Sequence, residues 1–270
     1  SYKLLPSLSR ILNTMQSLRF AKPAVDDLQK EIEEINKKNY QEIKKTQIEE
    51  INFNKNIIIE NISYTYGNSK IDVFKNFTYE IKKDKVLGVI GASGSGKSTL
   101  IDLLMGIINP QSGNIYVDDK NIKNITKSWQ RNIGYVPQDT YLLDESIKNN
   151  IAFGIPEKLI NIKKINEIIA SLGLKKMIDD LPYGIESYVG DNGVKLSGGQ
   201  KQRLGLARAL YISPKIIILD EATSALDIEN EEKILKLIGG IKNKISIIII
   251  SHRESIFPYC DQILNLDQAK

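Results

Sequence analysis

Residues 91–98 read GASGSGKS and match the spacing G-x-x-x-x-G-K-S, which concentrates residue types that bind phosphate. The glycines of such a stretch let the backbone bend close to a phosphate, and successive backbone amides can then point at the anion. Lys97 supplies a positive charge for the β- and γ-phosphates of a nucleotide, and the hydroxyl group of Ser98 can bind Mg²⁺. The sequence therefore predicts a phosphate loop, although this motif alone does not distinguish a kinase, a GTPase and a motor ATPase.

Two neighbouring carboxylates follow a run of apolar residues at 216–219. Successive side chains of a strand point in opposite directions, so Asp220 and Glu221 can serve different atoms. We expect Asp220 to reach Mg²⁺ through water and Glu221 to act as the general base that takes a proton from the attacking water. The alternative is a strand end whose acidic residues only cap the next helix.

A second candidate anion site is the signature segment, residues 196–200 with the sequence LSGGQ, which leads into a helical pattern over 198–211. A serine and two glycines at the beginning of a helix leave backbone amides that can bind an anion. The chain thus carries two candidate phosphate sites. Either it binds two phosphates itself, or one of the two sites serves a neighbouring molecule.

His252 is the only histidine of the chain and follows the apolar run at 246–250. Taken alone, a single histidine after such a run is more often structural than catalytic. An imidazole at the tip of a strand can also take part in chemistry, so both interpretations stay open on this residue alone.

Short runs of strand-like composition alternate with helical patterns from residue 56 onward. The continuous apolar runs at 216–219 and 245–250 are typical of parallel strands that are buried on both faces. Strands are expected at 56–66, 75–83, 85–91, 132–138, 215–222 and 246–252. Helical periodicity is clearest at 98–108, 157–181, 198–211 and 229–239. This alternation predicts an α/β domain with a mainly parallel sheet.

The first 50 residues form a different region. Apolar residues at helical spacing over 4–18 predict an amphipathic helix, and a second helix is expected from Pro23, because proline suits a first helical turn. Residues 30–50 are rich in Glu, Lys, Asn and Gln and are interpreted as the end of that helix plus a solvated linker. We therefore divide the chain into a helical arm, residues 1–50, and a domain, residues 51–270.

Composition excludes some classes of protein. The 37 basic and 33 acidic residues leave a net charge of +4, too small a surplus to argue for nucleic acid as a partner. No apolar stretch approaches the roughly 20 residues that a membrane helix needs. Cys260 is the single cysteine and cannot form an internal disulfide, which favours a reduced compartment, and we expect it to be buried as a small hydrophobic residue.

Taken in order, the stretches GASGSGKST, YVPQ, LSGGQ, IIILDEA, SALD and SH resemble the nucleotide-binding domain of ABC transporters, over roughly residues 55–267. The resemblance implies an α/β fold with a P-loop NTPase core, an antiparallel β subdomain and an inserted helical subdomain at about 140–212. It implies ATP and Mg²⁺ as ligands. It also implies a head-to-tail homodimer, in which the signature segment of one copy closes over ATP on the phosphate loop of the other.

The resemblance also assigns roles to single residues. Tyr66 would stack on adenine, Gln138 would touch Mg²⁺ and sense the membrane domain, and Asp227 would lie in a loop that crosses the dimer interface. His252 would contact the γ-phosphate and orient the water that Glu221 deprotonates. The remaining nucleotide contacts would be Gly91, Ser93, Gly94, Ser95, Gly96, Lys97, Ser98, Thr99, Ser197, Gly198, Gly199 and Gln200. The alternatives are a core aromatic for Tyr66, a turn residue for Gln138 and a helix N-cap for Asp227.

Residues 144–154 and 187–193 resemble segments of exporters, which predicts the ATPase module of a half transporter. Its transmembrane domain would lie upstream of Ser1, and the arm would continue its last transmembrane helix. The whole chain is similar to bacterial flippases of lipid-linked oligosaccharide, which implies protein N-glycosylation and the cytoplasmic face of the inner membrane. The alternatives are an exporter of another lipid, a peptide or a drug, and a soluble ABC ATPase of DNA repair or translation.

Overall fold

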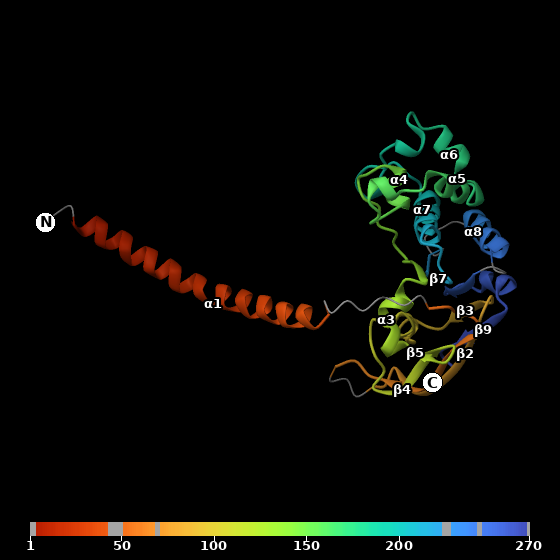
Figure 1. Cartoon of the computed structure of the whole chain (residues 1–270), viewed down its shortest axis with the longest axis horizontal. Coiled ribbons are helices and arrows are strands. Elements are labelled where there is room, and N and C mark those ends of the chain that lie inside the picture. Colours follow the sequence, from red (N-terminus) through yellow and green to blue (C-terminus); the bar gives the residue numbers. More distant parts are fainter. Residues whose placement is uncertain (1–3, 43–50, 68–70, 223–227, 242–244, 269–270) are drawn as a thin grey trace. The chain divides into compact units, whose positions relative to one another are not determined.

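The computed structural model describes the chain except residues 1–3, 43–50, 68–70, 223–227, 242–244 and 269–270. The chain divides into two compact units, Ser1–Glu49 and Glu50–Lys270 (Figure 1). The first unit contains one described helix, and the second contains every strand that the structure describes.

The first unit is a single helix, α1 (Leu4–Glu42), with Pro23 inside it. The expectation of two helices separated at Pro23 is therefore wrong. The helix ends at Glu42, within the 30–50 segment where a helix end and a linker were expected, and residues 43–50 lie outside the described part of the chain. An internal proline removes one backbone hydrogen bond and costs about 3 kcal/mol, but a long helix of good helix formers can continue past it. None of the described helices is both long enough and apolar enough to cross a membrane.

The centre of the second unit is a five-stranded sheet in which all neighbouring strands are parallel. Its strand order is β6 (Ile133–Val136), β7 (Ile216–Asp220), β8 (Ser246–Ile250), β3 (Val86–Ile90) and β9 (Gln262–Asn265). Alternate residues of a strand enter different cores, as the isoleucines of β8 show: Ile247 and Ile249 pack on one face, and Ile248 and Ile250 on the other. The predicted parallel sheet, buried on both faces, is confirmed.

An antiparallel sheet has the strand order β2 (Phe74–Lys82), β1 (Asn56–Tyr64), β4 (Ser112–Val117) and β5 (Lys120–Asn121). Strands β4, β5 and β9 were not among the expected strands, because they are short and lack long apolar runs. Ile57, Ile59 and Ile62 of β1 pack into the same core as one face of the parallel sheet, so the two sheets share that core. The antiparallel β subdomain that the resemblance implied is therefore present.

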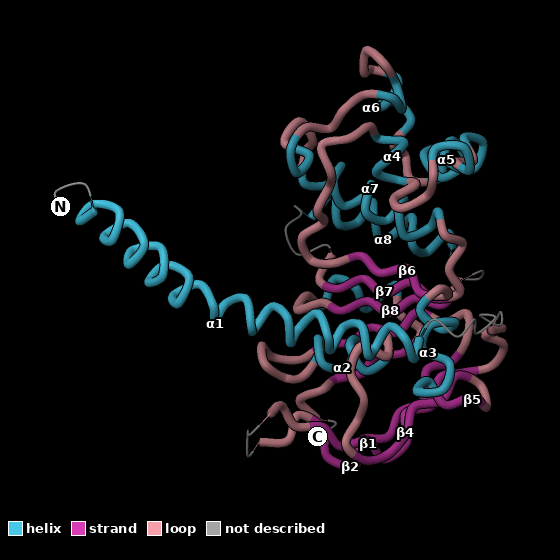
Figure 2. The backbone as a smooth tube through the Cα atoms, turned by 60° about the vertical axis from the view of Figure 1, so that its left-hand side comes forward, coloured by secondary structure: helices cyan, strands magenta, loops and turns pink. Residues whose placement is uncertain are grey.

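Helices surround the parallel sheet, and several of them form a separate group (Figure 2). The helices are α2 (Lys97–Leu104), α3 (Ile122–Gln130), α4 (Ile147–Ile151), α5 (Ile162–Ser171), α6 (Lys175–Asp179), α7 (Gly198–Tyr211) and α8 (Ile228–Ile241). Short 3-10 turns occur at η1 (Glu157–Leu159), η2 (Gly184–Glu186), η3 (Asp191–Gly193) and η4 (Glu254–Tyr259). Helices α4 to α7 lie together at one end of the parallel sheet, as expected for the inserted helical subdomain.

One expected helix is interrupted. The pattern over 157–181 predicts one helix, but the structure has η1, α5 and α6 there. Gly173 follows the end of α5 with a φ of 63°, a left-handed conformation that glycine adopts without steric cost and that commonly terminates helices. The periodicity continues across this break because both helices bury apolar side chains in the same core.

Candidate nucleotide site

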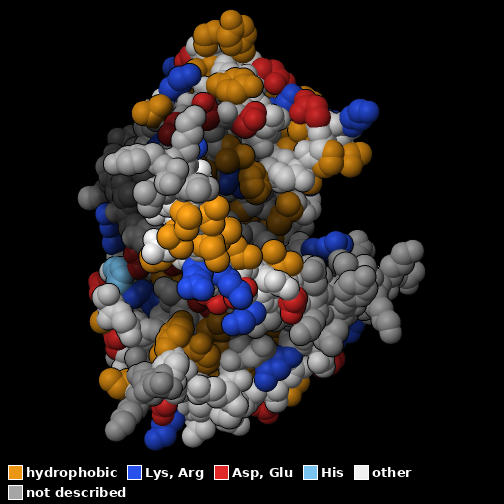
Figure 3. Space-filling model, turned by 90° about the vertical axis from the view of Figure 1, so that its left-hand side faces the viewer, with side chains coloured by type: hydrophobic (Ala, Val, Ile, Leu, Met, Phe, Trp, Pro, Cys, Tyr) orange, Lys and Arg blue, Asp and Glu red, His pale blue; other side chains and the backbone are white. Residues whose placement is uncertain are grey.

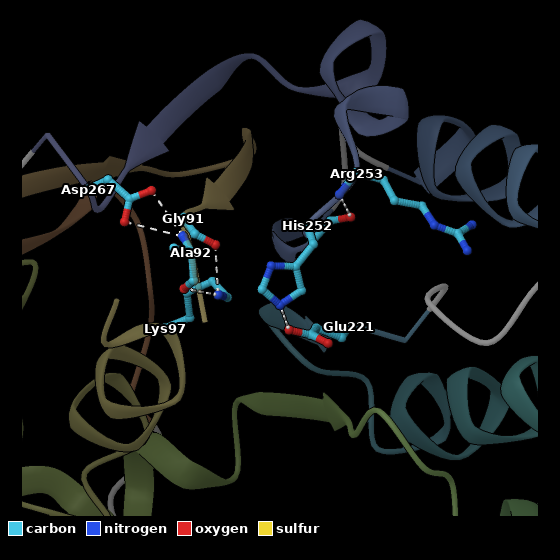
Figure 4. Close-up of polar contacts among 8 residues, drawn as sticks. Gly91, Ala92, Lys97, Glu221, His252, Arg253 and Asp267 are labelled. Atoms are coloured by element: carbon cyan, nitrogen blue, oxygen red, sulfur yellow. Dashed lines mark hydrogen bonds and ion pairs between the residues drawn. The ribbon is translucent and has the colours of Figure 1, made fainter. Parts of the chain in front are cut away.

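The carboxyl ends of the parallel strands bring the predicted site residues to one edge of the sheet. The phosphate loop follows β3, Asp220 and Glu221 lie at the end of β7, and His252 follows β8. Because these strands are parallel, their carboxyl ends meet, and ligands of open α/β sheets bind at that edge. Figure 4 shows Lys97 of the phosphate loop and the pair of His252 and Glu221 on neighbouring segments.

The phosphate loop has a conformation that needs its glycines. Gly96 is the N-cap of α2 with a φ of 99°, which is the left-handed region that side chains rarely adopt. A Cβ atom at Gly91 would lie 2.5 Å from Oγ of Ser95. Lys97 is buried, and its Nζ atom donates hydrogen bonds of 2.9 Å to the carbonyl oxygens of Gly91 and Ala92. The side chain of Lys97 thus connects the end of the loop to its beginning and places one positive charge inside the loop.

Ser95 carries an indication that this loop fits a phosphate. Its hydroxyl oxygen is buried and has no hydrogen-bond partner among the residues that the structure describes. Buried polar groups are nearly always hydrogen-bonded, so an unpaired one points to a missing partner. A phosphate oxygen would supply that partner, and the free amides at the beginning of α2 favour an anion there.

Asp220 lies at the end of β7 in a partly desolvated position. Burial raises the pKa of its carboxyl group above the ordinary value, and the hydrogen bond from the hydroxyl of Tyr135, at 3.0 Å, acts in the opposite direction. Burial, followed by the charge of Asp220, raises the pKa of Tyr135. A carboxylate that is poorly solvated gains most from a nearby cation, so Asp220 fits a divalent metal ion such as Mg²⁺.

Glu221 and His252 form a direct contact. The Nε2 atom of His252 lies 2.5 Å from Oε1 of Glu221. Glu221 has a φ of 48°, which costs a residue other than glycine about 1–3 kcal/mol and is characteristic of functional sites. Its backbone amide is held by the carbonyl oxygen of Ile250, at 3.1 Å. The structure therefore places a carboxylate and an imidazole together at the edge of the sheet.

The signature segment caps α7. Oγ of Ser197 accepts a hydrogen bond of 3.3 Å from the amide of Gln200, and Oε1 of Gln200 accepts one of 2.8 Å from the amide of Ser197. This reciprocal capping box fixes the start of the helix. Between the described residues of the signature segment and of the phosphate loop, the structure has no hydrogen bond or ion pair. Over these described residues, the signature segment thus makes no polar contact with the phosphate loop of the same chain.

The other predicted residues have different surroundings. Tyr66 exposes 48% of its surface, and its hydroxyl lies 3.2 Å from Oγ1 of Thr99 in α2, so it is not a core aromatic. Gln138 is exposed and follows β6 at the same edge of the sheet. Ser93 and Ser98 belong to the loop and to the first turn of α2. Asp227 lies outside the described residues.

Sequence reasoning missed two contacts at this site. One is the hydrogen bond from Tyr135 to Asp220, for which the only signal was a tyrosine in the strand before Gln138. The other is Asp267, whose carboxylate oxygens accept from the amide of Ala92 at 3.2 and 3.0 Å (Figure 4). Asp267 follows β9 and is remote from Ala92 in sequence, so no local pattern could have found this contact.

Comparison with known proteins gives the family. Residues 74–224, more than half of the chain, match the family model described as ABC transporter. A Rickettsia typhi protein, named provisionally as an export ATP-binding/permease protein, is 40% identical over 216 residues, which are 79% of this chain and 37% of that protein. The ATP-dependent lipid A-core flippase of Cupriavidus metallidurans is 34% identical over 216 residues, 79% of this chain and 36% of the flippase.

A solved structure agrees with these relatives. The structure of a bacterial Atm1-family ABC exporter with ATP bound has a TM-score of 0.74 and 31% sequence identity, and the match covers 83% of this chain and 39% of that chain. This chain spans little more than a third of the length of the curated relatives. The motifs, the fold and these matches agree, and the chain belongs to the ABC transporter family as an ATPase domain of exporter type that binds ATP with Mg²⁺.

Proposed function

We propose that this domain hydrolyses ATP at a composite site and thereby drives transport by a membrane part of the same polypeptide. The contact between Glu221 and His252, at the sheet edge that also carries Lys97, is the observation on which the proposal rests. It supplies a proton acceptor and a group that can orient water and phosphate beside an anion-binding loop.

Each residue of the site has a definite task in this proposal. Lys97 and the amides of the phosphate loop hold the β- and γ-phosphates, and Ser98, Gln138 and Asp220 hold Mg²⁺. The bound Mg²⁺ neutralises negative charge on the phosphates. Glu221 accepts the proton of the attacking water at its carboxylate, while His252 contacts the γ-phosphate and keeps the water in line. Tyr66 stacks on the adenine ring.

The second anion site indicates a second molecule. Ser197, Gly198 and Gly199 lie at the beginning of α7, where backbone amides favour an anion. We propose that they close over ATP that is bound to a second copy of the chain, in a head-to-tail homodimer with two composite sites. Gln200 and Asp227 belong to the same interface in this arrangement.

A groove on the helical subdomain suits the membrane part. A cavity of about 310 Å³ is lined by Leu143, Phe153, Ile155 and Glu157, among others, and the first three of these side chains are exposed to solvent. Figure 3 shows further hydrophobic side chains, in orange, on the surface at the tip of the helical subdomain. Exposed apolar surface of this kind favours a protein partner. We propose that α1 continues the last transmembrane helix of that partner region, which would precede Ser1.

The relatives and the resemblance of the whole chain support a lipid as the cargo. Flippases of lipid A-core are among the relatives, which favours a lipid as the transported molecule. We propose lipid-linked oligosaccharide for protein N-glycosylation as the cargo, and the cytoplasmic face of a bacterial inner membrane as the location of this domain. Another lipid, a peptide or a drug is the alternative cargo. A soluble ATPase of repair or translation has no support among the relatives named above.

The deciding experiment uses the polypeptide with its membrane part, reconstituted in sealed liposomes with a fluorescent lipid-linked oligosaccharide. Movement of the label across the bilayer that requires both ATP and Glu221 supports the proposal. The Glu221→Gln variant is the matched control, because it keeps the size of the side chain and removes the base. ATP hydrolysis without movement of the label would overturn the oligosaccharide assignment and direct the same assay to other lipids, peptides and drugs.

A further inference from the structure

The segment after β6 lies along helix α7. Residues 138–141 of this segment contact three positions of α7 that are three residues apart, Gln202, Gly205 and Arg208. Positions with this spacing share one face of a helix. One face of α7, the helix that begins in the signature segment, therefore contacts residues 138–141 along their length.

Gln202 holds the first residue of the segment. Its side chain is 6% exposed, and its Nε2 atom donates a hydrogen bond of 2.9 Å to the backbone carbonyl oxygen of Gln138. Its Oε1 atom accepts a longer hydrogen bond, of 3.5 Å, from the hydroxyl of Thr140. The buried side-chain amide of Gln202 thus uses both its nitrogen and its oxygen in hydrogen bonds, and it fixes the position of the backbone at Gln138. The side chain of Gln138 itself stays exposed.

Gly205 allows the segment to approach the helix. A Cβ atom at this position would lie 2.7 Å from both Cγ2 and Oγ1 of Thr140, which is 3% exposed. Such a contact is too short for any side chain, so either Thr140 or the helix would have to move. The absence of a side chain at Gly205 thus sets the distance between α7 and the segment.

Arg208 holds the far end of the segment. Its Nη1 atom donates a hydrogen bond of 2.9 Å to the carbonyl oxygen of Tyr141. Its Nε and Nη2 atoms donate to the carbonyl oxygen and the side-chain Oδ1 of Asn150, at 2.9 and 3.0 Å. The guanidinium also lies over the ring of Phe153, 5.0 Å from its centre. Arg208 therefore connects the segment to the groove proposed for the membrane part.

We propose that Gln202, Gly205 and Arg208 are positioning residues that hold Gln138 at the metal end of the ATP site. This inference rests on the proposed role of Gln138 toward Mg²⁺. Ser197 begins the same helix, so α7 carries the signature segment at its start, holds the backbone of Gln138 through Gln202, and reaches the ring of Phe153 through Arg208.

The test measures how much Mg²⁺ strengthens ATP binding to the purified chain, by titration calorimetry with and without EDTA. Gly205→Ala is expected to lower the apparent affinity for Mg²⁺ by about tenfold, as loss of a supporting partner does at metal sites, and to leave ATP binding in EDTA unchanged. The double variant Gly205→Ala/Thr140→Ala removes both colliding atoms and should recover most of the affinity. Recovery separates positioning from a general loss of fold.

Two further variants complete the design. Gly240→Ala in α8 is the matched control, because a Cβ atom there meets no atom within 4 Å. Gln202→Met removes the hydrogen bond to Gln138 without adding bulk, and it should lower the affinity for Mg²⁺ even if Gly205→Ala fails to fold. If Gln138→Ala weakens Mg²⁺ binding but the Gly205 and Gln202 variants do not, the inference is overturned. If Gln138→Ala has no effect, the proposed role of Gln138 fails, and the inference fails with it.

Discussion

The Nε2 atom of His252 lies 2.5 Å from Oε1 of Glu221, because both residues follow the ends of β7 and β8, which are neighbours in the parallel sheet. The backbone amide of Glu221 is bonded to the carbonyl oxygen of Ile250, and this contact holds the carboxylate beside the imidazole. Replacing Glu221 should therefore lower the rate of ATP hydrolysis much more than it lowers the affinity for ATP.

Replacing Glu221 with Gln should lower ATP turnover by about 10²–10⁴-fold, the range for the loss of a general base, with little change in ATP affinity. The variant should accumulate as a dimer with two bound nucleotides. Phosphate release and light scattering with Mg-ATP at high protein concentration measure the two effects. Turnover at the rate of the unmodified chain would exclude Glu221 as the base, and a monomer would weaken the composite-site model.

Lys97→Met and Ser197→Ala should each abolish turnover, but for different reasons, since Lys97 acts in its own copy and Ser197 in the partner. A mixture of the two inactive variants should recover activity, because a mixed dimer has one site in which both contributions are intact. Ser197→Ala also removes the cap of α7, worth about 1 kcal/mol, so thermal unfolding must show that it is folded. A folded pair without recovery would contradict the head-to-tail arrangement.

Cys260 should react slowly with iodoacetamide. Cys260 is partly buried, not fully buried as expected. Burial raises the pKa of its thiol from the ordinary 9.0 to about 11, so the thiolate fraction at pH 8 falls roughly a hundredfold. The folded pKa lies above the unfolded one, so reactivity should rise with pH up to about 11 and should increase at once on unfolding in guanidinium. Mass spectrometry of alkylated protein measures both rates, and equal rates would disprove the burial of the thiol.

Arg253→Met should destabilise the chain by about 1.5–3 kcal/mol, the range for a hydrogen bond to a charged group, since the Arg253 side chain is 40% exposed. The Nη1 atom of Arg253 lies 3.1 Å from Oε2 of Glu231 in α8, whose side chain is 2% exposed, and a buried carboxylate that loses a charged partner is costly. Guanidinium unfolding measures this loss. The double variant Arg253→Met/Glu231→Gln should be less destabilised than Arg253→Met alone, and equal losses would show that the ion pair is not the cause.

Much of this site could be predicted from sequence because its residues directly follow strands with unmistakable apolar runs. The phosphate loop after β3 and the carboxylates after β7 are examples, and the expected helix over 198–211 agrees with α7 in both of its bounds. Local patterns specify such elements because burial on both faces, or on one helical face, selects the residue types.

The remaining features depend on contacts between distant residues. Asp267 reaches the amide of Ala92 only because β9 pairs with β3, and Tyr135 reaches Asp220 only because β6 pairs with β7. No local pattern indicates the order of strands in the sheet. The continuation of α1 through Pro23 was missed for a different reason, since the preference of proline for a first turn does not forbid an internal position.

Strand β8 has four consecutive isoleucines, at 247–250, that alternate between the two cores. If β8 shifted by one residue along its neighbours, each isoleucine would be replaced in its core by another isoleucine. Such a shift normally exchanges the two buried faces of a strand, but here the packing of the two cores does not oppose it. The register of β8 must then be set by contacts at the two ends of the strand. At one end, Oγ of Ser246 accepts a hydrogen bond of 2.7 Å from the backbone amide of Asp84. At the other end, the backbone amide of Ser251 donates a hydrogen bond of 3.2 Å to the carbonyl oxygen of Val89. The hydroxyl of Ser246 thus fixes the register of β8, and this register places His252 beside Glu221.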